Sequence, residues 1–189
     1  MTLRLNGSTS GYVEIDAPAT AGSNTLVLPT GNGTNGQYLQ TNGSGSLSWA
    51  TVSAAGRIIQ IQSTTSSAQV STSSGSFQPT GFSLSITPSS INSKIIILCI
   101  TSGTPNAGNN GIIHVVRRGS TEVTNKTAIY NDGSANDTWR PTTLFGIDSP
   151  STTSSTSYEL YFRSASSALC YSNWGATAAQ QMHLLELEQ

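Results

Sequence analysis

Short apolar runs separated by turn residues cover the chain, and no stretch shows a convincing helical period. The run from Phe82 to Ile86 alternates strictly between apolar residues and serines, so it predicts a strand with Phe82, Leu84 and Ile86 on one face. Residues 94–101 are apolar on both faces, which indicates a central strand buried from both sides. Glycine, asparagine and proline separate the runs, as in a protein built from strands and tight turns.

The carboxyl-terminal part of the chain carries most of the predicted strands. We expect them at 57–62, 69–72, 82–86, 94–101, 111–118, 121–124, 142–147, 157–163, 168–172 and 180–187. Residues 125–141 are expected to form the longest loop region. So many short strands without a helix are typical of a β-sandwich. We therefore predict an all-β, jelly-roll-like β-sandwich head over 57–189, with an immunoglobulin-like sandwich as the alternative.

Residues 1–52 form a separate, small β module with very short apolar runs. About a dozen scattered large apolar residues cannot bury enough surface for such a module to fold alone. Its missing core must come from another copy of the chain or from a partner surface. The residues expected to make this assembly or anchoring contact are Leu3, Leu5, Tyr12, Val13, Ile15, Leu26, Leu28, Tyr38, Leu39 and Trp49. Residues 53–56, all small, are expected to be a linker.

The small number of charged residues argues against nucleic acid as a partner. Charged residues make up 9% of the 189 residues, and the net charge is −1. With eight basic residues and a single tight pair, Arg117-Arg118, no basic face for nucleic acid is expected. The apolar runs are too short for membrane insertion, and the amino terminus lacks the pattern of a secretory signal, so we expect assembly in a cytoplasm. There, Cys99 and Cys170 are expected to be buried small apolar residues, although one disulfide is arithmetically possible.

No residue pattern predicts catalysis, a metal site or a cofactor site. His114 and His183 are expected to be satisfied or subunit-interface residues, because no nucleophile-elbow motif accompanies them. Glu186 and Glu188 are expected to be a solvated pair near the chain end, which argues against a glycan-cleaving enzyme.

One loop has residues that could bind calcium. Asp132, Asn136 and Asp137 offer oxygen ligands, but their spacing does not match a calcium-binding loop, so a solvated turn is the favoured interpretation.

Two tryptophans in loop-like contexts are candidates for glycan contact. Stacking of Trp139 and Trp174 on sugar rings, with Arg140 and Asn173 reading hydroxyls, would suit a receptor-binding tip. The alternative is that both tryptophans plug the ends of the sandwich or the subunit contacts, and the usual burial of large aromatic residues favours it.

The segments GYVEIDAPATAGSNTLVLP (11–29), GQYLQTNG (36–43) and LSWA (47–50) stand in the order found in a module of bacteriophage fibre proteins, which they resemble. The similarity is greatest to fibres of phages that infect marine and freshwater bacteria, as in cyanophages. The segments ITPSSINSKI (86–95), IDSP (147–150), YELYFR (158–163) and LLEL (184–187) are similar to the heads that follow such modules.

The resemblance implies a non-enzymatic virion structural protein that forms a short homotrimeric fibre. This fibre would be a tail fibre or a capsid-surface fibre or decoration protein, assembled in the cytoplasm of the bacterial host. Its amino-terminal module would anchor it to other virion proteins of the capsid or tail, and its head would serve host-surface attachment. A trimeric head would be similar to the complement-globular-head and tumour-necrosis-factor group. The alternatives are a glycan-binding tip that recognises the receptor and, less favoured, a glycan-cleaving enzyme.

Overall fold

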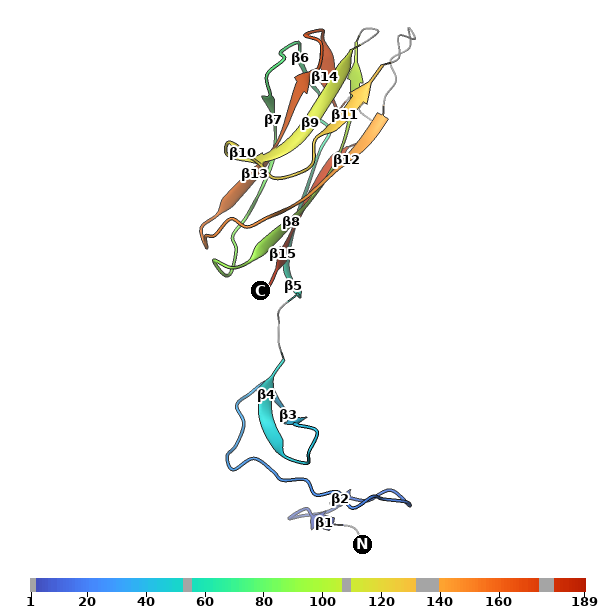
Figure 1. The fold of residues 1–189 in the computed structure, drawn as a ribbon, viewed down its shortest axis with the longest axis vertical. Helices are drawn as coiled ribbons and strands as arrows, with labels where there is room; N and C mark the ends of the chain where they lie inside the picture. The colour runs from blue at the N-terminus through green and yellow to red at the C-terminus, as the bar shows by residue number, and fades with distance from the viewer. Residues whose placement is uncertain (1–2, 53–55, 107–109, 132–139, 174–178) are drawn as a thin grey trace. The chain divides into compact units, whose positions relative to one another are not determined.

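The computed structural model describes residues 3–52, 56–106, 110–131, 140–173 and 179–189. All regular secondary structure in these ranges is β-strand (Figure 1), and none of it includes a helix that could cross a membrane. The chain separates into two compact units, Met1–Ser53 and Ala54–Gln189, and each is described by itself.

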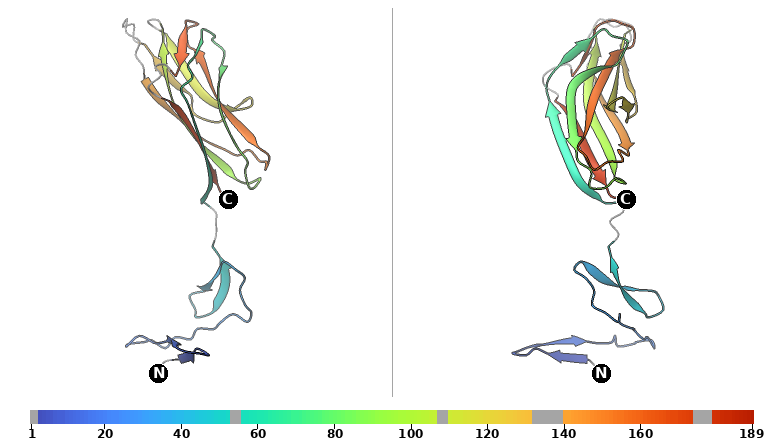
Figure 2. Two further views of the ribbon diagram at one scale, coloured as in Figure 1. Left: turned by 180° about the vertical axis from the view of Figure 1, so that it is seen from behind. Right: turned by 90° about the vertical axis from the view of Figure 1, so that its left-hand side faces the viewer.

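The carboxyl-terminal unit is a β-sandwich with two sheets that face each other (Figure 2). The first sheet contains β5 (Ile58–Ser66), β15 (Gln180–Leu187), β8 (Lys94–Pro105), β14 (Cys170–Ser172) and β6 (Val70–Thr72), with β12 (Arg140–Asp148) paired to β8. The second sheet contains β10 (Thr121–Glu122), β9 (Gly111–Arg118), β13 (Thr156–Ser164) and β7 (Gln78–Ile86), with β11 (Thr127–Tyr130) paired to β9.

The strand order is that of a jelly roll. β15 and β14 pair with successive parts of the same side of β8. On their other side, β15 pairs with β5 and β14 pairs with β6. β5 and β6 together therefore occupy one strand position in the sheet, and β14 and β15 together occupy the next. β10 and β11 likewise share one position beside β9. With the eight positions numbered along the chain, the sheets have the orders 1-8-3-6 and 2-7-4-5, and all their ladders are antiparallel. This order confirms the predicted jelly-roll-like sandwich and excludes the immunoglobulin-like alternative.

The core lies between the sheets. The predicted alternation in β7 is confirmed, because Phe82 and Ile86 are buried and Leu84 packs against them. β8 is a central strand, as expected, with Ile95, Ile97 and Cys99 fully buried. The prediction that β8 is buried from both sides is wrong, however, since the alternate residues at 96, 98 and 100 are only half-buried.

Two other expectations fail locally. The strand expected at 121–124 is limited to the short β10, and β11 forms inside the region expected to be a loop. Thr127–Tyr130 become a strand because the edge of β9 offers them a ladder from Gly111 to His114. Tertiary pairing therefore overrides the loop-like composition of this segment.

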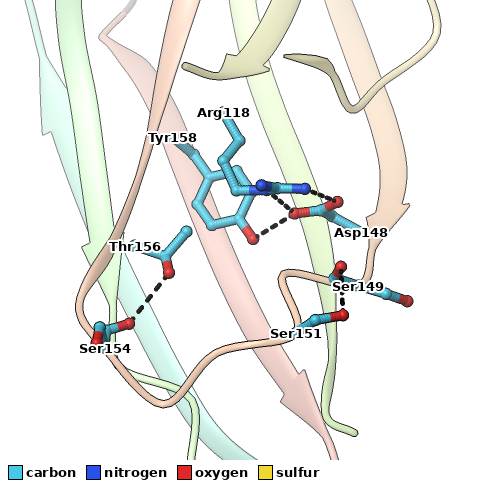
Figure 3. Close-up of polar contacts among 7 residues, drawn as sticks. All are labelled: Arg118, Asp148, Ser149, Ser151, Ser154, Thr156 and Tyr158. Carbon is cyan, nitrogen blue, oxygen red and sulfur yellow. Dashed lines mark hydrogen bonds and ion pairs between the residues drawn. The ribbon is translucent and has the colours of Figure 1, made fainter. Parts of the chain in front are cut away.

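Polar side chains tie strands together inside the sandwich. Tyr158 on β13 donates a hydrogen bond of 2.8 Å to Asp148 on β12, and Arg118 on β9 donates two more to the same carboxylate, at 2.6 and 3.1 Å (Figure 3). β12 belongs to one sheet, while β9 and β13 belong to the other, so Asp148 joins both sheets. Burial and the bond to Asp148 raise the pKa of Tyr158, which therefore stays a neutral donor.

Glu186 on β15 is fully buried, so the expectation of a solvated pair with Glu188 is wrong for this residue. Its Oε1 accepts hydrogen bonds from the backbone N–H of Ser89 at 2.7 Å, the Ser89 hydroxyl at 2.6 Å and the Ser93 hydroxyl at 2.7 Å. Burial acts to raise the pKa of Glu186, but these bonds to the ionised form outweigh it and hold the pKa below its ordinary value. Glu188 extends toward Arg57 instead, at 4.0 Å.

The amino-terminal unit consists of two hairpins and a connecting segment. β1 (Leu3–Asn6) pairs with β2 (Tyr12–Ile15), and β3 (Gln37–Thr41) pairs with β4 (Leu47–Thr51). Both ladders are antiparallel, and a single parallel bridge joins Val27 to Ser46.

Candidate assembly site of the amino-terminal unit

The β1–β2 hairpin has one apolar face. Leu3 lies opposite Ile15 and Leu5 lies opposite Val13, and residues directly opposite each other in a ladder point to the same side. All four side chains are between 55% and 67% exposed. The hairpin thus presents a row of branched aliphatic side chains that the described part of this chain leaves uncovered.

The opposite face of this hairpin is polar and has its own internal contacts. Arg4 pairs with Glu14 at 2.5 Å, and its guanidinium lies 4.0 Å from the centre of the Tyr12 ring. Tyr12, predicted as an assembly residue, therefore lies on the other face from Leu3, Leu5, Val13 and Ile15. The hairpin is amphipathic, and an amphipathic hairpin is stable only when its apolar face is covered.

The connecting segment adds a second exposed apolar group. The backbone N–H of Val27 donates to Gly45 at 2.8 Å, and its carbonyl accepts from Leu47 at 2.8 Å, which holds the segment beside the second hairpin. Leu26 and Leu28 on either side of Val27 are each 67% exposed. Val27 is itself exposed and was not among the predicted assembly residues, although its place between two leucines marks it in the sequence.

Trp49 organises the second hairpin. It lies opposite Leu39, and its indole N–H donates to the carbonyl of Gly31 at 2.8 Å. The ring packs closely over Gly33, where an added Cβ would lie 2.6 Å from the ring atom Cδ2. Trp49 is 38% exposed even so, and Tyr38 on the other face of the hairpin is also exposed. Trp49 therefore holds the loop before β3 in place, but it does not form a buried core for this unit.

No residue between 3 and 52 is buried, whereas the head contains two buried apolar clusters. The ten predicted assembly residues are all exposed. Exposed apolar rows such as the one on the β1–β2 hairpin are typical of surfaces on which another protein packs. Burial of these exposed apolar side chains against another surface would be favourable, because it removes apolar area from water.

The four residues predicted to contact glycan are not brought together by the described structure. Trp139 and Trp174 lie outside the described residues. Arg140 is exposed at the start of β12. Asn173 is 1% exposed, and its amide donates to the carbonyls of Ser66 and Ala68, so this side chain stabilises the loop between β5 and β6. Glycan contact therefore stays a prediction.

The two histidines have different surroundings. His114 on β9 is fully buried, and its Nε2 lies 2.9 Å from Oγ of Ser172 on β14. Burial lowers the pKa of His114 to about 3, so the ring is neutral near pH 7. His183 is half-buried on β15, with its Nδ1 2.9 Å from the hydroxyl of Ser63. Within the described residues, each ring is hydrogen-bonded to a serine, and neither is bonded to an acidic side chain of the kind a catalytic triad requires.

The cysteines are both fully buried and unbridged. Burial raises the pKa of Cys99 to about 12 and that of Cys170 to about 11, so both are protonated thiols. Asp132, Asn136 and Asp137, considered above as calcium ligands, lie outside the described residues. Within the described ranges, no three His, Cys, Asp or Glu side chains are grouped to hold a metal ion.

Comparisons with known proteins identify no relative by sequence. No protein-family model and no curated protein matches this chain. Among solved structures, the chain is similar to the VP2 subviral particle of infectious bursal disease virus, at 18% identity and a TM-score of 0.35. It is also similar to the structures of the Gx and Gt strains of this virus, at 14% and 15% identity and TM-scores of 0.38 and 0.33.

These three matches cover 95%, 97% and 98% of this chain but only 44%, 44% and 46% of the matched chains. The chain thus spans less than half the length of the proteins it matches. TM-scores this low do not establish a shared fold, so the fold assignment rests on the strand order of the head.

Proposed function

We propose that this chain is a non-enzymatic structural protein of a bacteriophage particle, and that its amino-terminal unit is completed by contact with other copies of the chain. The observation that carries the proposal is the absence of any buried residue between 3 and 52, beside a head that has its own core. A unit without an interior gains its stability from the surface on which it packs.

The virion setting is supported by the resemblance of residues 11–29, 36–43 and 47–50 to phage fibre modules. The jelly-roll order of the head is compatible with this setting, since jelly rolls recur in viral shells, although the fold is also found in proteins of other functions. In this proposal the protein is a short homotrimeric fibre of the tail or capsid surface. Its amino-terminal unit docks on other virion proteins, and its head faces the host.

The test is the mass of the full chain in solution, measured by light scattering over a series of concentrations. We expect a trimer for the natural sequence and a large shift toward monomer for the double variant L5S/V13S, which removes apolar side chains from one face of the β1–β2 hairpin. The matched control is Asn6→Ser, on the other face of the same hairpin. A natural chain that stays monomeric at every concentration would overturn the proposal.

Location on the particle needs a second experiment. An antibody against the head should label intact phage particles in electron micrographs, and the site of labelling would distinguish the tail from the capsid. Absence of the protein from purified particles would contradict the virion role.

A further inference from the structure

The two outer faces of the head sandwich differ sharply in chemistry. On the five-stranded sheet, Arg117 lies opposite Glu159 in the ladder and pairs with Glu122 at 2.9 Å. The guanidinium of Arg117 also lies 4.6 Å from the centre of the Phe77 ring, and Arg163 lies 5.5 Å from it. Charged side chains with local partners of this kind are typical of a face in contact with water.

The outer face of the six-stranded sheet instead has two adjacent rows of mostly apolar residues. One row across four adjacent strands consists of Ile61 on β5, Leu185 on β15, Ile96 on β8 and Ile147 on β12. These residues are directly opposite one another in the three ladders, so their side chains lie on one face. Ile61 is 60% exposed and Ile147 is 54% exposed.

The next row on this face continues the pattern. It consists of Ser63, His183, Leu98 and Phe145 in the same strand order. Phe145 is 52% exposed, and the two polar members satisfy each other through the bond between Ser63 and His183. Neither row contains a charged residue. The face made by these eight residues is called the apolar sheet face below.

We infer that the apolar sheet face is a contact between copies of this chain, through which the heads of the assembled protein pack on one another. The inference rests on the proposed function for its partner, a second copy of the chain. Residues close to a rotation axis meet their own copies, so a charge placed there meets like charges. Repulsion between like charges would not arise at the apolar sheet face, because its two rows contain no charged residue. It would arise at the charged outer face of the other sheet.

The geometry favours approach by the face rather than by strand addition at the β12 edge. At Phe145 that edge is already occupied, because Asn125 accepts from the Phe145 N–H through Oδ1 at 2.8 Å and donates its own N–H to the Phe145 carbonyl at 3.1 Å. A new strand cannot pair with these backbone groups. The Phe145 side chain points out from the sheet and is free to insert into a neighbouring head.

The inference can be tested by thiol labelling of the full-length chain. Ile61→Cys places a thiol on the apolar sheet face, and Ser83→Cys places a control thiol on the exposed outer side of β7. The natural cysteines are buried and contribute little background. At concentrations where the protein is assembled, we expect maleimide to label position 61 at least tenfold more slowly than position 83, and dilution to monomer should remove the difference.

A charge on the apolar sheet face provides a second readout. Adding Phe145→Lys to the Ile61→Cys chain should raise the labelling rate of position 61 at least tenfold, because lysines of adjacent copies would meet without partners. Ser83→Lys in the same background should leave the rate unchanged.

The outcomes separate the inference from the proposed function. Labelling of position 61 at the control rate in an assembled protein would overturn the inference and leave the proposed function standing. Protection that persists in the monomer would also overturn it, because the cover would then come from the same chain. A natural protein that never assembles would overturn both.

Discussion

The hydroxyl of Tyr158 lies 2.8 Å from Oδ2 of Asp148 and connects the two sheets of the head through a side chain that is fully buried. These residues belong to the segments 158–163 and 147–150, which resemble fibre heads in the sequence. Ser89 and Ser93, from segment 86–95, likewise bond to Glu186 of segment 184–187. The four segments thus meet in pairs, and each pair encloses a carboxylate.

Tyr158→Phe removes one donor from the Asp148 carboxylate and leaves the two bonds from Arg118. We expect the free energy of unfolding of the head to fall by about 1.5–3 kcal/mol, the usual worth of a hydrogen bond to a charged group. Denaturant unfolding of the full chain measures it. Tyr161→Phe, at a half-buried outward position on the same strand, is the control and should change stability by less than about 0.5 kcal/mol. Equal changes in the free energy of unfolding for the two substitutions would show that the hydrogen bond from Tyr158 to Asp148 does not stabilise the head.

Glu186→Gln replaces the buried acceptor of three hydrogen bonds with a neutral amide. We expect a loss of about 1–3 kcal/mol at pH 7. Because folding lowers the pKa of Glu186, its contribution is full above the ordinary value of 4.5 and is lost as the pH falls through the folded value. The natural protein should therefore lose stability below about pH 4.5 more steeply than the variant. Glu188→Gln should keep the steep loss, and a Glu186 variant that also keeps it would contradict the prediction.

His114 makes the head sensitive to acid in a different range. Its pKa is lowered from 6.5 to about 3 on folding, so below pH 6.5 the unfolded chain binds a proton that the folded chain does not. Stability should fall as the pH drops from 6.5 toward 3, with a slope of at most about 1.4 kcal/mol per pH unit from this group. Unfolding of the natural protein and of His114→Gln, compared between pH 6.5 and about 4.5, measures this slope. Identical slopes would show that the ring titrates normally when folded.

Gly33→Ala should disturb the amino-terminal unit, because its Cβ would lie 2.6 Å from Cδ2 of Trp49. The loop or the indole must move, which weakens the bond from the Trp49 indole to Gly31. We expect a shifted indole N–H resonance for Trp49 in nuclear magnetic resonance spectra of the full chain. Gly31→Ala is the control, because a Cβ there meets nothing within 4 Å. An unchanged resonance in Gly33→Ala would contradict the packing of Trp49 on this loop.

The sequence alone determined the all-β class, most strand positions of the head and the shortage of core-forming residues in the amino-terminal unit. Each depends on local information: the alternation of Phe82, Leu84 and Ile86, turn residues between short runs, and a shortage of apolar residues. These features can be recognised without the three-dimensional structure, because the period of a strand and the size of a module are properties of the sequence itself.

The tertiary structure decided what each side chain meets. Glu186 looks like a terminal, solvated acid in sequence, but pairing of β15 with β8 places it where Ser89 and Ser93 reach it. The residues of the apolar sheet face come from four strands far apart in sequence, and only the ladder registers place them in rows. The apolar run predicted that Ile96 and Leu98 are buried, but in the structure both are only half-buried. Whether another part of the same chain packs on them depends on the arrangement of distant strands, which the run does not specify.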